Sequence, residues 1–309
     1  MNRRILLIGK NGQIGRELHR LLPRVGDFVA LDRQGLDLTK PDDIRHAIRS
    51  IRPGIIVNAA AYTAVDQAES DSTTARIINT DAPRIIAGEA KAADAVLVHY
   101  STDYVFDGTK RTPYVEDDLP NPLSVYGRTK LGGEVAIREA GVAHLIFRTE
   151  WVYATEGRNF LLTVLRLAGE REELRIVRDQ IGAPTSSREI AEATVRILEQ
   201  VCDRASDTRS FWEVSGVYHM TAGGETTWFD FAKAILEEVQ SAPRVDWLQR
   251  ATWQRPLIAR RIVPVTTNEY PTPATRPAYS ILSNSRLNRT FGISLPDWQS
   301  QLACLMGQN

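Results

Sequence analysis

The chain has 309 residues, enough for one large α/β domain or for a domain with a smaller second part. Its 38 basic and 38 acidic residues balance to a formal net charge of zero, which argues against recognition of nucleic acid or of an anionic membrane by charge. No apolar run approaches about 18 residues and no signal-type segment precedes the first strand, so we expect a cytoplasmic protein that does not cross a membrane. Cys202 and Cys304 lack metal-ligand spacing, and we expect both to be core thiols.

The first predicted elements are a strand, a glycine turn and a helix. Arg3–Ile8 has the continuous apolar character of a buried parallel strand, and a helix is expected from about Ile14 to Leu22. The turn between them contains Gly9, Gly12 and Gly15. In a dinucleotide-binding turn the first glycine permits the bend, the second lets the backbone approach a pyrophosphate, and the third lets the helix pack against the strand. These glycines therefore predict a dinucleotide site, with the phosphates at the helix N-terminus.

A second short strand, Phe28–Leu31, ends at Asp32 and Arg33. An acid at this point usually binds the ribose 2′-hydroxyl of NAD, whereas a base accepts the 2′-phosphate of NADP. Because both follow in succession, the choice between NADH and NADPH is left open. A simple surface charge explains Arg33 equally well.

Strands and helices continue to alternate. We expect a helix at Pro41 capped by Thr39 or Asp42, a helix over Ala82–Ala93, and strands over Ile55–Asn58 and Ala95–Tyr100. This order predicts a doubly wound parallel α/β sheet of the Rossmann-like type, which binds ligands outside the carboxyl ends of its strands. The residues after the third strand would let a flat ring or ribose lie against the backbone, or would only allow a tight turn: Ala59, Ala60, Ala61, Tyr62 and Thr63.

Tyr126 and Lys130 lie four residues apart at the start of a helix predicted from Tyr126 to about Ala140, so they share one face. A phenol of pKa ~10 becomes a proton donor near neutral pH if its pKa falls by ~3 units, or about 4 kcal/mol. One ammonium ~4 Å away supplies about that much at an effective dielectric of ~20. The pair alone is weak, but Thr102 follows the strand ending at Tyr100 and would face the same crevice. We therefore predict that Thr102, Tyr126 and Lys130 are catalytic.

The sequence changes character from Val152 onward. Helices are expected over Asn159–Gly169, Glu189–Val201 and Trp228–Gln240, the last begun by Thr226 or Thr227, with a short strand at Tyr218–Met220. Residues 254–280 contain five prolines and are predicted to be irregular. We predict a dinucleotide-binding domain of residues 1–150 with returning segments at about 185–220, and a smaller α+β substrate-binding lobe of residues 151–184 and 221–309. Asn159 and Arg276 are candidates for a substrate diphosphate; structural hydrogen bonding in a loop explains them equally well.

Several motifs together resemble a known family. The glycine pattern, Ser101–Phe106 and Tyr126–Lys130 resemble the extended short-chain dehydrogenase/reductases that act on nucleotide sugars. Four later segments narrow the resemblance to the dTDP-4-dehydrorhamnose reductase family over nearly the full length: Phe147–Tyr153, Asp179–Thr185, Tyr270–Pro277 and Leu295–Trp298. Related epimerases share the first set of motifs but not the second.

This resemblance implies a role for each matching residue. Tyr126 would donate the proton, Lys130 would lower its pKa and hold the nicotinamide ribose, and Thr102 would complete the triad. Asp103 would help to hold the sugar, and Val65 and Trp151 would line its pocket. Cofactor contacts are implied at Gly12, Gln13, Ile14, Asp32, Asp37, Leu38, Ala61, Tyr62 and Thr63.

Some members of the family bind Mg²⁺ at a dimer contact through three acidic side chains. Glu17 and Asp297 match two of these positions, but Arg188, with Glu189 beside it, stands at the third. A cation in place of a carboxylate would repel Mg²⁺. We therefore expect no metal ion and not that form of homodimer, while a homodimer through another contact stays open.

The resemblance implies NADPH- or NADH-dependent reduction of dTDP-4-dehydrorhamnose to dTDP-L-rhamnose, a precursor of cell-surface polysaccharides. The expected partner is a dTDP-sugar, without nucleic acid or membrane. Two alternatives stay open. One is a non-catalytic regulatory subunit that uses the same pocket for docking, although such a binder need not keep all of Thr102, Tyr126 and Lys130. The other is a different NDP-4-keto-6-deoxysugar reductase or an epimerase, which product stereochemistry and net consumption of reduced cofactor would distinguish.

Overall fold

The computed structural model describes residues 4–204, 208–241, 246–251 and 256–307. Within these ranges, six strands form one sheet in which every neighbouring pair is parallel, in the order β10-β5-β4-β3-β1-β2. The strands are β1 (Ile5–Ile8), β2 (Phe28–Leu31), β3 (Ile55–Asn58), β4 (Val96–Thr102), β5 (His144–Thr149) and β10 (Gly216–His219). The predicted doubly wound parallel sheet is confirmed.

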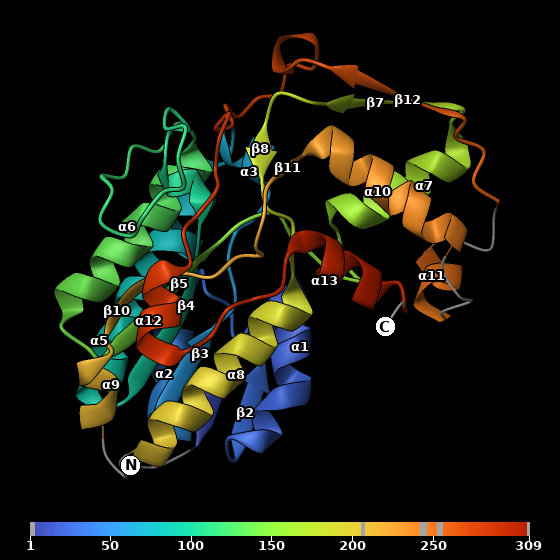
Figure 1. Ribbon diagram of the computed structural model, residues 1–309. Coiled ribbons are helices and arrows are strands. Elements are labelled where there is room, and N and C mark those ends of the chain that lie inside the picture. Colours follow the sequence, from blue (N-terminus) through green and yellow to red (C-terminus); the bar gives the residue numbers. More distant parts are fainter. Residues whose placement is uncertain (1–3, 205–207, 242–245, 252–255, 308–309) are drawn as a thin grey trace.

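Helices cover both faces of this sheet (Figure 1). One face packs against α1 (Gln13–Leu21) and α8 (Ser187–Arg204); the other packs against α2 (Pro41–Ile51), α5 (Ala82–Ala92) and α6 (Val125–Ala140). Successive strand residues point to opposite faces, so Leu7 enters the core beside α1 and Leu6 enters the core beside α2. Burial on both faces explains why these strands are apolar throughout rather than alternating. Short helical segments complete this part: η1 (Leu22–Arg24), α3 (Val65–Ala68), α4 (Ser72–Arg76), the π-helical η2 (Ile77–Asp81), η3 (Asp103–Val105), α9 (Arg209–Glu213) and α12 (Ser285–Phe291).

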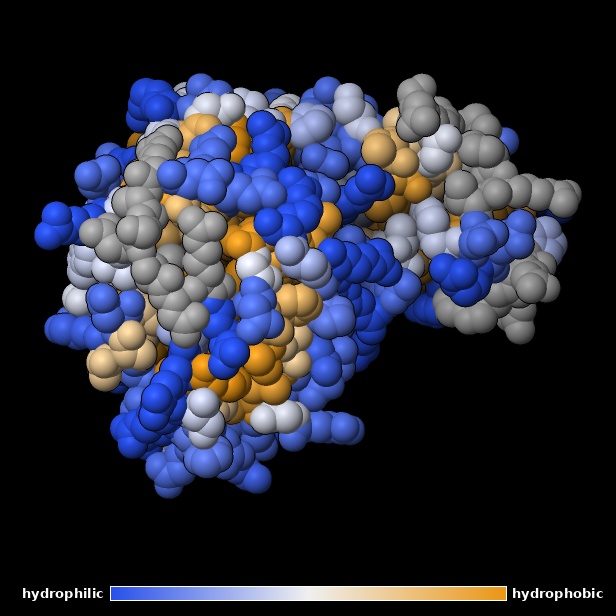
Figure 2. Space-filling view, turned by 90° about the horizontal axis from the view of Figure 1, so that it is seen from below, coloured by the Kyte–Doolittle hydropathy of each residue, from blue (hydrophilic) through white to orange (hydrophobic). Residues whose placement is uncertain are grey.

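A smaller second part lies beside the main body (Figures 1 and 2). It has its own core, which includes Leu165, Phe231 and Trp298. Its helices are α7 (Phe160–Glu170), α10 (Trp228–Ser241), α11 (Asp246–Ala251) and α13 (Trp298–Leu305), with the turn η4 (Thr267–Glu269). Its short strands pair as β7 (Glu173–Val177) with β12 (Arg261–Val265), β8 (Ile181–Gly182) with β11 (Thr226–Thr227), and β6 (Val152–Tyr153) with β9 (Thr185–Ser186).

The structure differs from the local predictions at four points. Arg261–Val265 is a strand, although residues 254–280 were expected to be irregular; residues 252–255 lie outside the described ranges. Lys40, rather than Thr39 or Asp42, is the N-cap of α2. Thr39 does not cap the helix because its hydroxyl and its backbone N–H both donate to the Asp37 carboxylate. The Cys304 thiol is exposed while Cys202 is buried. Strand β4 runs on to Thr102, which belongs to the strand rather than following it.

No helix among the described residues is long and apolar enough to cross a membrane.

Candidate active site

The glycine turn after β1 is built for close approach of a ligand. Gly9 has a φ of +89°, and a Cβ there would lie 2.8 Å from the backbone nitrogen of Ala60. A Cβ at Gly15 would lie 2.0 Å from the Gly9 carbonyl oxygen, so only glycine lets α1 pack this tightly. Gly12 is the N-cap of α1, and no side chain caps the helix. The positive end of α1 is therefore available to a pyrophosphate, and Gln13 and Ile14 stand in its first turn.

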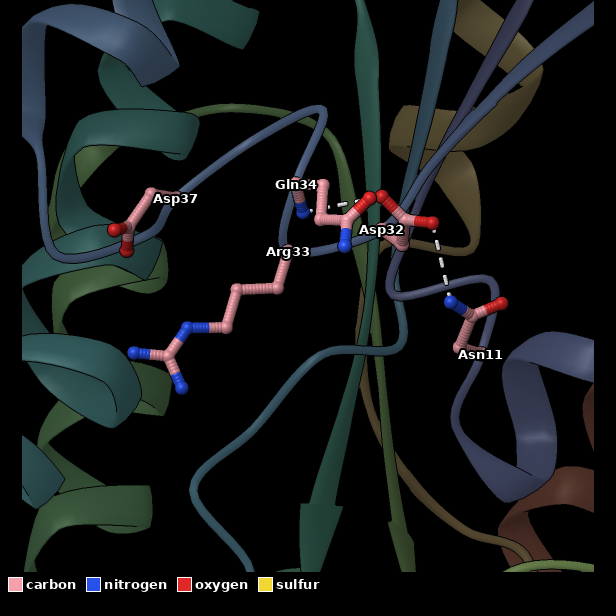
Figure 3. A pocket seen from close by; sticks show the side chains of 5 residues that line it. All are labelled: Asn11, Asp32, Arg33, Gln34 and Asp37. Atoms are coloured by element: carbon pink, nitrogen blue, oxygen red, sulfur yellow. Dashed lines mark hydrogen bonds between the residues drawn. The ribbon is translucent and has the colours of Figure 1, made fainter.

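A pocket of about 550 Å³ follows β2, lined by Asn11, Asp32, Arg33, Gln34 and Asp37 (Figure 3). Asp32 stabilises the turn that follows it, because one of its carboxylate oxygens accepts hydrogen bonds from the backbone N–H groups of Gln34 and Gly35, both at 3.1 Å. Its other oxygen accepts a hydrogen bond from Asn11 at 3.1 Å. These bonds lower the pKa of Asp32, the Gly35 N–H most. The Arg33 side chain extends along the pocket away from Asp32, so the pocket is lined by both an acid and a base.

The residues after β3 continue the same edge of the sheet. The Asn58 side chain accepts a hydrogen bond from the Ala60 N–H at 3.2 Å, and Ala59 and Ala61 are partly buried beside it. The backbone of Tyr62 exchanges hydrogen bonds with the Asn79 side chain. Thr63 is exposed, and Leu38, by contrast, packs inside the core of the α2 face.

Thr102 and Tyr126 lie at the carboxyl end of β4. Tyr126 shares a small apolar cluster with Tyr62, Val65 and Tyr104, and its ring packs edge-on against that of Tyr104. The Thr102 hydroxyl donates to the Asp103 carboxylate at 2.9 Å and accepts from the Tyr104 N–H at 3.2 Å. Burial raises the pKa of Tyr126, while a hydrogen bond with Thr102 opposes the rise. We had predicted the opposite, a lowered pKa. With the raised pKa, the phenol is protonated at neutral pH.

Lys130 is buried on the same face of α6, at 2 % exposure. Its ammonium donates to the Tyr100 carbonyl at 2.6 Å and lies 3.4 Å from the His99 ring, which in turn contacts the Asn58 side chain. Burial lowers the pKa of Lys130 to about 8, and the nearby Glu134 opposes this change. Lys130 is thus held by the strand behind the site, and its charge does not bring the pKa of Tyr126 down.

One helical turn beyond Lys130, Glu134 forms a buried ion pair with Arg148 of β5. The guanidinium donates two hydrogen bonds, at 3.0 and 2.7 Å, and Ser101 also donates to Glu134. Neither ion is more than 3 % exposed. The pair fixes α6 against two strands and so sets the position of Tyr126 and Lys130. The i, i+4 spacing of residues 126, 130 and 134 was the available signal for Glu134.

The predicted substrate residues meet different partners. Asn159 caps α7 by accepting the Leu162 N–H at 3.0 Å and donates to Gln13 at 3.0 Å, so it stands beside the cofactor turn. Arg276 is paired with Asp66 at 2.8 Å, next to Val65. The Trp151 ring stacks on Trp228 of the second part with 3.5 Å between ring centroids. Trp228, Glu134 and His99 were not singled out by sequence reasoning.

The residues weighed for Mg²⁺ have protein partners. Asp297 caps α13 by accepting from the backbone and hydroxyl of Ser300, and Glu17 accepts from Arg20. Among the residues that the structure describes, no group of three or more His, Cys, Asp or Glu side chains is placed to hold a metal ion.

The parallel sheet, the glycine turn with an open helix N-terminus, and a Thr, Tyr and Lys set at the carboxyl end of β4 define a protein of the extended short-chain dehydrogenase/reductase type. The sequence profile of the RmlD substrate binding domain matches residues 3–308. The chain belongs to the dTDP-4-dehydrorhamnose reductase family.

Named relatives span almost the whole chain. A dTDP-4-dehydrorhamnose reductase of Burkholderia thailandensis is 48 % identical, covering 96 % of this chain and 95 % of its own. One from Escherichia coli is 44 % identical, covering 96 % and 94 %. The crystal structure of a dTDP-4-dehydrorhamnose reductase of Bacillus anthracis in complex with NADP superimposes with a TM-score of 0.87 at 32 % identity, covering 100 % of both chains.

Proposed function

We propose that this protein reduces the 4-keto group of dTDP-4-dehydro-6-deoxy-L-mannose (dTDP-4-dehydrorhamnose) to give dTDP-L-rhamnose, with NADPH or NADH as cofactor. The observation that carries the proposal is membership, over nearly the full length, of a family whose named relatives are dTDP-4-dehydrorhamnose reductases. The cofactor assignment is supported by the NADP complex of the Bacillus anthracis relative and by the glycine turn, where side chains at Gly9 and Gly15 would clash.

The glycine turn and the Thr102, Tyr126 and Lys130 set would act on different parts of the cofactor and the sugar. Gly9, Gly12 and Gly15, with the N-terminus of α1, fit the pyrophosphate of a dinucleotide, and Asp32 and Arg33 fit its adenosine ribose. When bound, the reduced nicotinamide supplies the hydride. The Tyr126 phenol, kept protonated by burial, would donate its proton to the sugar oxygen as negative charge develops there. Thr102 would hold that oxygen and the phenol in line, and Lys130 would hold the nicotinamide ribose.

The proposal is tested by following loss of reduced-cofactor absorbance with dTDP-4-dehydrorhamnose, using NADH and NADPH in parallel. We expect consumption of cofactor and formation of dTDP-L-rhamnose. No consumption with either cofactor would contradict the proposal.

Tyr126→Phe tests the role of the phenol. Loss of a general acid typically lowers turnover by about 10²–10⁴-fold, and we expect such a loss with unchanged cofactor binding. Tyr218→Phe is the matched control, because that hydroxyl lies in the main core, where it donates to the Val214 carbonyl and is hydrogen-bonded to Thr290. An active Tyr126→Phe protein would refute the assignment of Tyr126.

A second candidate is a related ketoreductase with another substrate. A probable dTDP-4,6-dihydroxy-2-methyloxan-3-one 4-ketoreductase of Streptomyces antibioticus is 37 % identical over 97 % of this chain. Comparing the two keto sugars as substrates, and the stereochemistry of the products, separates the candidates. Cytoplasmic location and a homodimer stay predictions.

A further inference from the structure

Trp151 has a backbone conformation that bulky residues rarely adopt. Its φ is +45°, in the left-handed region. The other two non-glycine residues with positive φ in the described ranges, Arg52 and Asp94, stand at the ends of helices α2 and α5, where chains commonly adopt it. Trp151 ends no helix, so its surroundings must impose the strain, and strain of this kind is concentrated at functional sites.

The place of Trp151 in the main sheet agrees with a functional role. Thr149, the last residue of β5, pairs in register with Thr102 of β4, and Trp151 follows two residues later. Parallel strands have their carboxyl ends at one edge of a sheet, and ligands bind outside that edge. Trp151 therefore lies at the same edge as Thr102 and Tyr126.

Both faces of the Trp151 ring are covered. Trp228 stacks on one face, with 3.5 Å between ring centroids and 7° between ring planes, and such close overlap leaves no room beside it on that face. A Cβ at Gly182 would lie 2.4 Å from Cε2 of the Trp151 ring and 2.7 Å from both Cζ2 and Nε1. A point this close to all three atoms lies above the ring rather than beyond its rim, so the Gly182 backbone covers the opposite face.

Trp228 and Gly182 are themselves fixed by the second part of the molecule. Gly182 of β8 pairs with Thr226 of β11, two residues before Trp228. The Trp228 indole N–H donates to Gln180 Oε1 at 3.2 Å, and the buried Gln180 side chain donates to the Thr267 hydroxyl at 3.1 Å. The Trp228 ring cannot turn away from Trp151 without breaking its hydrogen bond to Gln180.

We propose that Trp228 and Gly182 are positioning residues, which hold the Trp151 ring between them as a rigid part of the lining of the sugar-nucleotide pocket. This inference rests on the proposed function. Trp151 is only partly buried, and because both faces of its ring are covered, a ligand reaches the edge of the ring. An indole edge has one N–H donor among apolar C–H groups, which suits the hydroxyl groups and the methyl group of a 6-deoxysugar.

Binding of dTDP-L-rhamnose, measured by titration calorimetry in the absence of cofactor, tests the role of Trp228. Trp228→Leu keeps an apolar side chain but removes the flat ring, and we expect the affinity to fall by about tenfold or more while NADP binding is unchanged. Trp247→Leu is the matched control, since Trp247 is a partly buried indole of the same core whose N–H donates to the Leu305 carbonyl at 3.0 Å. Its affinity should stay at the wild-type level. Equal losses in the two variants, or no loss in either, would overturn the proposal.

Two further variants change the same contact in other ways. Trp228→Phe keeps an aromatic face against Trp151 and should bind dTDP-L-rhamnose within about threefold of wild type. Gly182→Ala adds a methyl group where only 2.4 Å is available, which displaces the Trp151 ring, so the affinity should fall by about tenfold. Wild-type affinity in Gly182→Ala, or a loss in Trp228→Phe as large as that in Trp228→Leu, would contradict the inference.

A double-mutant cycle separates positioning from direct contact with the ligand. Trp151→Leu alone should weaken binding at least as much as Trp228→Leu. If Trp228 acts only through Trp151, adding Trp228→Leu to Trp151→Leu should change the affinity by less than about twofold. Additive losses would show that Trp228 acts on the ligand itself or through general stability, and would overturn the proposal.

Turnover distinguishes this inference from the proposed function. Trp228→Leu should raise KM for dTDP-4-dehydrorhamnose by about tenfold and keep kcat within about threefold, because it leaves Thr102, Tyr126 and Lys130 unchanged. A fall in kcat with an unchanged KM would contradict the inference. If wild type binds dTDP-L-rhamnose but does not reduce dTDP-4-dehydrorhamnose, the proposed function fails, while the binding measurements still decide the role of Trp228.

Discussion

Lys130 lies in an environment that charged side chains usually avoid. An ammonium at 2 % exposure has lost most of its hydration, and its pKa falls to about 8 for that reason. The Tyr100 carbonyl at 2.6 Å compensates in part. A charge held at such a free-energy cost in a cleft is typical of a functional position, where stability is lost for the sake of chemistry.

We expect Lys130→Met to be inactive but at least as stable as wild type at pH 7. Because folding lowers the pKa of Lys130, the unfolded chain binds more protons than the folded one between the two pKa values. Wild-type stability should therefore rise between about pH 8 and about pH 10, and the advantage of the variant should shrink. Urea unfolding at several pH values measures this. Lys233→Met, on an exposed helix face, should show no such trend.

The sequence was sufficient to place Tyr126 and Lys130 on one helical face, because spacing alone determines that. It could not give the direction in which the pKa of Tyr126 moves. That depends on how completely the phenol is buried and on the Tyr100 carbonyl and His99 ring, which hold Lys130 from another element. Glu150 was part of a recognised motif, but its burial beside Ser280, 130 residues later, arises only from tertiary structure.

At the scale of elements, α6 carries the site and is held unusually close to its neighbours. A Cβ at Gly127 would lie 2.2 Å from the Tyr104 carbonyl oxygen, and one at Gly133 would lie 2.3 Å from the Asn79 carbonyl oxygen. Both contacts are with backbone, which cannot move aside as a flexible side chain can. Glycine at these two positions therefore lets α6 pack directly against the backbone of η3 and η2.

We expect Gly133→Ala to lower the free energy of unfolding by about 1–3 kcal/mol, because overpacking must displace backbone. Turnover should fall with it, since α6, which carries Tyr126 and Lys130, must shift away from η2. The matched control is Gly88→Ala on the exposed face of α5, where a Cβ meets nothing within 4 Å. There the same change should stabilise by about 0.5–1 kcal/mol through helix propensity. Equal effects at the two positions would contradict this account.

The longer helices of the described residues were predicted to within a few residues, because apolar periodicity and capping residues are local, whereas short helices such as α12 and α13 were not predicted. Strand β12 was missed for a local reason as well. Pro264 argues against a central strand, but the residue is exposed and β12 pairs only with β7, at an edge where proline is tolerated. The partner of a strand is set by tertiary structure, which local patterns do not contain.

At the scale of the whole molecule, residues 285–306 pack into both hydrophobic cores. Leu287 and Phe291 of α12 pack into the core of the main sheet, whereas Leu302 of α13 and the following Met306 pack into the core of the second part. Hydrogen bonds also join the two parts beside the glycine turn, where Gln13 bonds to the Val152 carbonyl and to the Asn159 side chain. The predicted division at residues 150, 185 and 220 stays a prediction, with α12 packed on the main sheet.

We expect Leu287→Ala and Leu302→Ala each to lower stability by about 2–5 kcal/mol, the usual range for emptying a buried leucine site. Because one terminal segment serves both cores, each variant should shift one common unfolding transition. Denaturation followed by tryptophan fluorescence and by circular dichroism measures this. Two separate transitions, each sensitive to only one substitution, would show that the parts unfold independently.

The position of α12 and α13 has a consequence for biosynthesis. While the ribosome is still adding residues 285–307, the sheet can assemble but neither core can be sealed, and apolar surface stays open to solvent. The nascent polypeptide therefore completes its folding only after residues 285–307 have left the ribosome.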